Sequence, residues 1–116
     1  MTQGLDEELS DATLFKETLK TIEDEVKTIP VLLYMKGTKS MPLCGFSGRV
    51  IEILHELDCD FEAKNVLDDK ILREAVKKFS DWPTFPQLYI NGTFIGGCDI
   101  VSQMYETGEL KKILDE

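Results

Sequence analysis

The stretch that most constrains the fold of this chain is a strand-to-helix turn that carries a cysteine. The apolar run Val31–Met35 is too short for a buried helix and predicts a buried strand. Apolar residues then recur at helical spacing over residues 45–57, so Cys44 falls at the start of a helix. Backbone N–H groups there are unpaired and favour a thiolate over a thiol. The sequence therefore predicts a reactive or metal-binding sulfur at Cys44.

The remaining patterns predict a fixed order of helices and strands. In chain order we expect a helix over 11–28 capped by Ser10 or Asp11, strand 31–35, helix 45–57, strand 60–66, a helix through 71–79 capped by Asp68 or Asp69, strands 87–90 and 93–96, a helix over 100–106 capped by Asp99, and a short helix over 109–114. The pair Asn91-Gly92 is a strong signal for a two-residue hairpin turn. A βαβ unit followed by a hairpin and a helix predicts an α/β fold with a mixed sheet.

Length, charge and cysteine usage narrow the class of protein. The 116 residues suit one domain, which we assign to residues 10–116 after a polar, flexible segment over 1–9. A net charge of −9 argues against nucleic-acid and anionic-membrane partners, and no apolar run approaches a membrane span. Three widely spaced cysteines indicate a reducing intracellular compartment. The N-terminus matches no signal or transit peptide, so we expect the cytoplasm, or the mitochondrial matrix if a transit peptide was removed.

Four clusters along the chain carry a resemblance to a known family. They are Lys36-Gly37-Thr38, Cys44-Gly45-Phe46-Ser47, Trp82-Pro83-Thr84-Phe85-Pro86-Gln87-Leu88-Tyr89 and Gly96-Gly97-Cys98-Asp99. In this order and spacing they resemble the monothiol glutaredoxin family, whose motif is Cys-Gly-Phe-Ser. The resemblance covers about residues 12–114 without a gap. It implies a thioredoxin-like fold, with a four-stranded mixed sheet flanked by helices in the order α-β-α-β-α-β-β-α-α.

The motif has one cysteine where dithiol redox proteins have two. A second cysteine three residues on would resolve a mixed disulfide, but Ser47 stands there. We expect the Ser47 hydroxyl to donate a hydrogen bond toward the sulfur or the helix end. Lys36 supplies the nearest positive charge favouring a thiolate, and beside this turn we prefer that interpretation to a solvated loop lysine.

The other clusters fit an extended peptide with a charged group at each end. The resemblance places a cis-proline at Pro86, which would leave the Phe85 backbone free to pair with a peptide; an ordinary trans turn is the alternative. Gly96-Gly97 opens a helix whose N–H groups suit a carboxylate. By resemblance, the glutathione-binding positions are Lys36, Arg73, Phe85, Cys98 and Asp99, with Cys98 acting mainly through its backbone.

The resemblance also implies an iron–sulfur cluster, and ligand counting shows how these positions would hold it. A [2Fe–2S] cluster needs four thiolates, and Cys44 supplies one per chain. A cluster here would need two chains and two external thiols, which two glutathiones would provide. The family holds such a cluster between two subunits and passes it to acceptor proteins. We therefore expect iron–sulfur acceptors as partners, a cluster-bridged homodimer and a monomeric apo form.

Two competing functions remain open at this point. The first is a glutathione-dependent thiol–disulfide oxidoreductase with Cys44 as nucleophile, and the second is an adaptor that recruits a partner through its acidic N-terminal helix. The five-residue insert Thr38–Pro42 favours a carrier of the iron–sulfur cluster over both, because the insert would hold glutathione away from a reactive pose. A regulatory disulfide between Cys44 and Cys98 is a further hypothesis.

Several residues are expected to have structural roles. We interpret Cys59 as a small core or edge residue, His55 as an exposed helix residue, and Trp82 and Tyr89 as packing groups. One histidine and scattered cysteines do not predict a zinc site.

Overall fold

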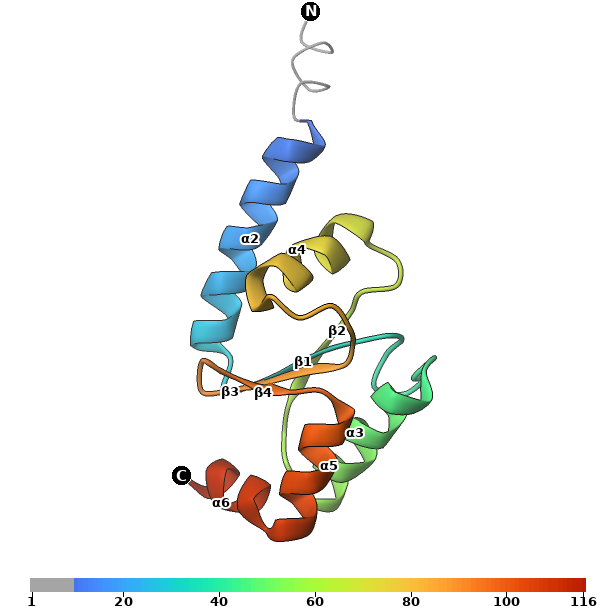
Figure 1. Cartoon of the computed structure of the whole chain (residues 1–116), viewed down its shortest axis with the longest axis vertical. Coiled ribbons are helices and arrows are strands. Elements are labelled where there is room, and N and C mark those ends of the chain that lie inside the picture. Colours follow the sequence, from blue (N-terminus) through green and yellow to red (C-terminus); the bar gives the residue numbers. More distant parts are fainter. Residues whose placement is uncertain (1–9) are drawn as a thin grey trace, which may run out of the picture.

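A four-stranded sheet forms the middle layer of the molecule, with helices on both faces (Figure 1). The computed structural model describes residues 10–116, and the flexible segment expected over 1–9 lies outside this range. The elements are α2 (Asp11–Thr28), β1 (Val31–Met35), α3 (Gly45–Glu56), β2 (Glu62–Asn65), α4 (Lys70–Ser80), β3 (Gln87–Ile90), β4 (Thr93–Gly96), α5 (Cys98–Thr107) and α6 (Glu109–Asp115). Their order is the predicted one.

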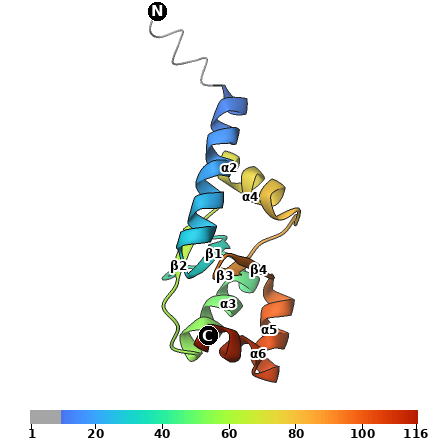
Figure 2. The same cartoon turned by 90° about the vertical axis from the view of Figure 1, so that its left-hand side faces the viewer.

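The strand order in the sheet is β2-β1-β3-β4. β1 runs parallel to β2 and antiparallel to β3, and β3 and β4 form the hairpin predicted from Asn91-Gly92. Helices α2 and α4 pack together on one face, and α3, α5 and α6 cover the other, as the perpendicular view shows (Figure 2). The predicted α/β fold is therefore confirmed. None of the helices in the described part of the chain is both long and apolar enough to cross a membrane.

The two faces of β1 explain its continuous apolar sequence. Successive strand side chains point to opposite faces. Leu32 and Tyr34 belong to the core layer under α2 and α4, whereas Leu33 and Met35 belong to the layer under α3 and α5. Since the strand is buried on both sides, it shows no alternation, and it places the following loop at a fixed edge of the sheet.

Most predicted ends agree with the structure, and two differ. Ser10 and Asp69, each one of the two predicted candidates, cap α2 and α4 through their side-chain oxygens. The strand expected over 60–66 is shorter, because only Glu62–Asn65 pairs with β1. The prediction that Asp99 caps α5 is wrong: the helix begins at Cys98, Gly97 is its N-cap, and Asp99 lies in the first turn.

Candidate functional site

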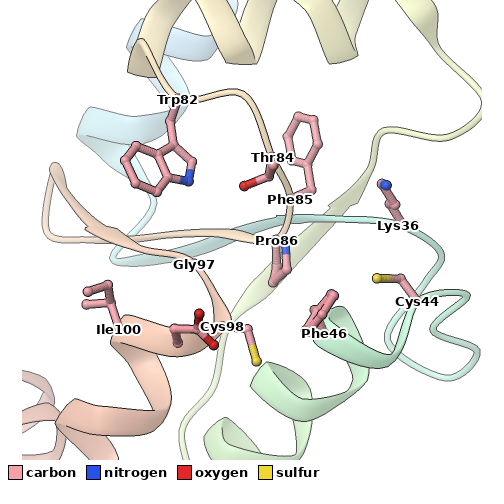
Figure 3. Close-up of a pocket in the computed structure, with 11 residues that line it drawn as sticks. Lys36, Cys44, Phe46, Trp82, Thr84, Phe85, Pro86, Gly97, Cys98 and Ile100 are labelled. Atoms are coloured by element: carbon pink, nitrogen blue, oxygen red, sulfur yellow. The ribbon is translucent and has the colours of Figure 1, made fainter.

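A pocket of about 370 Å³ lies where the starts of α3 and α5 approach the loop between α4 and β3 (Figure 3). We name two of its sides. The thiol wall consists of Lys36, Cys44 and Phe46, and the proline wall consists of Trp82, Thr84, Phe85 and Pro86. The start of α5, residues 97–100, closes the pocket. Most of the predicted site residues therefore meet in one cavity.

Cys44 is the N-cap of α3 and has an extended backbone, with φ −147° and ψ 133°. Its side chain is half-buried at the pocket. The backbone N–H of Ser47 is the main cause that lowers the pKa of the Cys44 thiol. The Phe46 N–H, the Lys36 charge and the Ser47 hydroxyl lower the pKa further, while burial opposes them. The direction of this shift and its main cause agree with the prediction that the start of a helix favours the thiolate of Cys44.

Ser47 lies in the first turn of α3 and is completely buried. Its Oγ accepts a hydrogen bond of 3.1 Å from the backbone N–H of Lys36, and its hydroxyl also helps to lower the pKa of the Cys44 thiol. The predicted interaction with the sulfur is thus accompanied by a second one that holds the start of the loop. The residue in the place of a resolving cysteine fixes the geometry of the thiol wall.

The loop between Lys36 and Cys44 is closely hydrogen-bonded. Thr38 and Met41 exchange backbone hydrogen bonds of 3.0 and 3.1 Å, and the Leu43 N–H donates to the Lys36 carbonyl at 2.9 Å. Gly37 has φ +101°, a conformation open mainly to glycine, and its N–H donates to Asn65 Oδ1 at 3.0 Å. The insert is therefore a folded turn with a defined position beside Cys44.

The outer surface near the thiol is apolar. Met41, Leu43 and Phe46 are 66, 63 and 63% exposed, respectively. The charge of Lys39, which belongs to the same turn, is held at another aromatic ring: its ammonium lies 4.1 Å from the centroid of Phe61.

The proline wall contains the cis Phe85–Pro86 bond that the resemblance implied. The Phe85 ring is buried in the core layer with α2 and α4, so the residue reaches the pocket mainly through its backbone. Trp82 has the packing role expected for it, because its ring centroid lies 6.1 Å from that of Phe94. It is also 43% exposed and lines the pocket, which the sequence interpretation missed.

At the start of α5, Gly97 lies close to the proline wall. A Cβ at this position would approach the Pro86 carbonyl oxygen to 3.2 Å. Asp99 is exposed in the first helical turn and lines the pocket. Cys98 also lines it, while its side chain packs against the core below the sheet and its sulfur points toward α3 (Figure 3). The cysteines are free thiols in this structure.

Arg73 is the one predicted site residue that does not line the pocket. Its Nη1 donates to the carbonyl oxygens of Val66 and Leu67 at 3.1 and 3.2 Å, across the turn between β2 and α4. Cys59 packs against the core layer under α3 and α5, and His55 is exposed, as predicted. Within residues 10–116, no three His, Cys, Asp or Glu side chains are grouped so as to hold a metal ion.

Comparison with known proteins identifies the family. The family model described as glutaredoxin matches residues 31–95. A "Probable monothiol glutaredoxin 2" of Rickettsia typhi is 58% identical over 100 residues, which cover 86% of this chain and 90% of that protein. This chain belongs to the monothiol glutaredoxin family. The "Monothiol glutaredoxin-5, mitochondrial" of Saccharomyces cerevisiae is 50% identical, over 89% of this chain and 71% of that one.

A solved structure shares the fold. The solution structure of reduced poplar apo GrxS14 has a TM-score of 0.73 and 48% sequence identity, over 83% of this chain and 88% of that chain. Membership of the monothiol glutaredoxin family agrees with the single cysteine, Cys44, in the motif.

Proposed function

We propose that this monothiol glutaredoxin carries a [2Fe–2S] cluster as cargo, with Cys44 and the thiol of a bound glutathione as ligands, and delivers it to iron–sulfur acceptor proteins. The observation that carries the proposal is the position of Cys44: a thiol of lowered pKa at a pocket of about 370 Å³, with Ser47 in the place of a resolving cysteine. Such a sulfur is suited to ligation, because metals bind the thiolate.

The lining of the pocket supports glutathione as the second thiol. Lys36 and Asp99 offer one positive and one negative side chain, which suit the carboxylate and the zwitterionic end of an extended peptide. The Phe85 backbone would pair with the cysteine of that peptide, and the Cys98 backbone lies at the N-terminus of α5, where N–H groups favour a carboxylate. Arg73 would contribute through guanidinium N–H groups other than those of Nη1.

The donor set supports a cluster shared between two chains. A [2Fe–2S] cluster needs four thiolates, and each chain brings Cys44 and one glutathione. The exposed apolar residues Met41, Leu43 and Phe46 flank Cys44 in the chain and would be covered in such a dimer. We therefore propose a cluster-bridged homodimer and a monomeric apo form, in a reducing compartment; one yeast relative is named as mitochondrial.

The lowered pKa of Cys44 also favours a second candidate, a glutathione-dependent oxidoreductase. In that reaction the Cys44 thiolate attacks the glutathione sulfur of a mixed disulfide and releases the substrate as a thiolate. A second glutathione then attacks the Cys44–glutathione disulfide, which regenerates Cys44 and gives oxidised glutathione. Turnover on a glutathione mixed disulfide, at a rate that matches an authentic dithiol glutaredoxin, would make this the main function.

Anaerobic reconstitution with iron, sulfide and glutathione tests the carrier. We expect visible absorbance, a dimer by size-exclusion chromatography, and two irons with two glutathiones per dimer. Omission of glutathione or the Cys44→Ser substitution should abolish all three. The matched control is Cys59→Ser, which removes a half-buried thiol away from the pocket and should load normally. A Cys44→Ser variant that still binds the cluster would contradict the proposal.

A further inference from the structure

Gln87, the first residue of β3, is a polar side chain with no exposed surface. Its Nε2 donates to the carbonyl oxygens of Trp82 and Thr84, both at 3.1 Å. Its Oε1 accepts a hydrogen bond of 3.0 Å from the Tyr89 hydroxyl. Because carbonyl oxygens only accept, Nε2 must face the loop, and this orientation alone satisfies all three partners.

These bonds act on the proline wall from behind. A glutamine buried between α2, α4 and the sheet costs free energy unless each polar group is paired, so its presence needs a reason beyond packing. Trp82 and Thr84 both line the pocket, and Gln87 holds the carbonyl of each on the buried side of the loop. The start of the loop has separate support, since the Trp82 N–H donates to Ser80 Oγ and to the Lys77 carbonyl.

The bond to the Thr84 carbonyl also orients the Phe85 N–H. The peptide between Thr84 and Phe85 is trans, and in a trans peptide the C=O and N–H point in opposite directions. Since the Thr84 oxygen points inward to Gln87, the Phe85 N–H points outward from the buried amide. This N–H is the group that would pair with the backbone of an extended peptide in the pocket.

We propose that Gln87 is a positioning residue: its side-chain amide fixes the peptide plane before Phe85, and thereby the wall that recognises the glutathione backbone. The inference rests on the glutathione-binding function proposed above. Tyr89 completes the arrangement by holding the amide from its other end. Without the two Nε2 bonds, the carbonyls of Trp82 and Thr84 would turn toward water, and the Phe85 N–H would lose its fixed direction.

The test is a Gln87→Met variant of the full chain, which keeps the length of the side chain and removes both donors. We expect calorimetry to give about a tenfold weaker affinity for reduced glutathione, as the loss of a net hydrogen bond implies. The pH titration of the Cys44 thiolate should not change, because the bonds that lower its pKa lie on the thiol wall. A general loss of structure would change both.

A second readout needs no ligand. Trp82 is the single tryptophan of the chain, it sits on the clamped loop, and it is 43% exposed, so acrylamide quenching should increase by up to about twofold when the loop is released. The matched control is Ile22→Ala, which opens a cavity in the same core layer without touching the loop. It should lower stability while leaving Trp82 quenching and glutathione affinity unchanged.

The outcomes separate this inference from the proposed function. If Gln87→Met keeps the glutathione affinity and the Trp82 quenching of the wild type, the positioning role is overturned. It is also overturned if Ile22→Ala changes the affinity and the quenching as much as Gln87→Met does. If the wild-type chain does not bind glutathione, the proposed function fails instead. Quenching then decides whether Gln87 holds the wall, and an unchanged value would overturn that role as well.

Discussion

The two walls of the pocket hold their shape by different means. The thiol wall depends mainly on local backbone conformation: Gly37 at φ +101°, a hydrogen-bonded turn, and the start of α3, whose N–H groups lower the pKa of Cys44. One side chain from α3 itself, the Ser47 hydroxyl, supports it by accepting from the Lys36 N–H. The proline wall depends on one buried side chain, since Gln87 holds two of its carbonyl groups. The first arrangement fixes where a sulfur sits and how it ionises, and the second fixes which backbone groups face a bound peptide.

This difference has a consequence for mutation. A change of backbone conformation on the thiol wall should disturb the folding and the chemistry of Cys44 together. A change of side chain behind the proline wall should alter ligand affinity while leaving the thiol intact.

Gly37→Ala should have the largest effect. A Cβ at this position would lie 2.5 Å from the Leu43 nitrogen and 2.6 Å from the Met41 oxygen, and neither backbone atom can move without unfolding the turn. With the cost of a positive φ added, we expect the free energy of unfolding to fall by about 2 kcal/mol or more. Urea denaturation measures this loss, and the pKa of Cys44 should rise in the same variant.

Gly45→Ala is the matched control for that substitution. Gly45 is the first residue of α3, and nothing lies within 4 Å of the Cβ that alanine would add. We expect a change within about 1 kcal/mol, in the stabilising direction, because alanine loses less conformational entropy in a helix. Equal destabilisation by the two substitutions would show that the conformation of Gly37 does not hold the thiol wall.

The thiol wall could be predicted from sequence because its determinants are local. The apolar run of β1, the helical spacing after Cys44 and the missing second cysteine at Ser47 all lie within a short stretch. The same holds for the order of elements, since the continuous burial of β1 and the turn chemistry of Asn91-Gly92 are visible in the residues themselves.

The remaining features depend on packing between distant segments. Aspartate is a favoured N-cap, which is why the sequence predicts that Asp99 caps α5. In the structure the chain passes close to the Pro86 carbonyl at Gly97, where a side chain would be crowded, and the helix starts at the next residue with Gly97 as its N-cap. The resemblance implies a binding role for Arg73, but it does not predict that the guanidinium turns to the carbonyls of the preceding turn. A glutamine at the start of a strand gives no sign of burial, so the role of Gln87 emerged only from the structure.

Tyr89→Phe should have an intermediate effect, confined to the proline wall. The substitution leaves Gln87 Oε1 without its partner in the core and should lower the free energy of unfolding by about 1 kcal/mol. Burial raises the pKa of Tyr89 to about 12, so the hydroxyl remains a neutral donor at physiological pH. Glutathione affinity should fall less than in Gln87→Met, because both Nε2 bonds remain. A larger fall than in Gln87→Met would contradict the role given to the amide.

Lys36→Met should have the smallest effect, and it separates charge from backbone on the thiol wall. The Lys36 charge lowers the pKa of Cys44, so its removal should raise that pKa and reduce the thiolate fraction at pH 7. The midpoint of the thiolate absorbance at 240 nm should therefore move to higher pH, and alkylation of the Cys44 peptide should slow. The midpoint in Lys36→Met should still lie below that of an ordinary cysteine, because the backbone N–H groups of Ser47 and Phe46 remain.

Lys39→Met gives the control for charge, because the Lys39 ammonium lies against the Phe61 ring and does not act on Cys44. It should leave the Cys44 midpoint unchanged at the same net charge as Lys36→Met. An equal shift in both variants would mean that the overall charge of the chain, and not the position of Lys36, sets this part of the pKa. A Lys36→Met midpoint equal to that of the wild type would show that the Lys36 charge has no part in the shift, and would assign the lowered pKa to the N–H groups at the start of α3 together with the Ser47 hydroxyl.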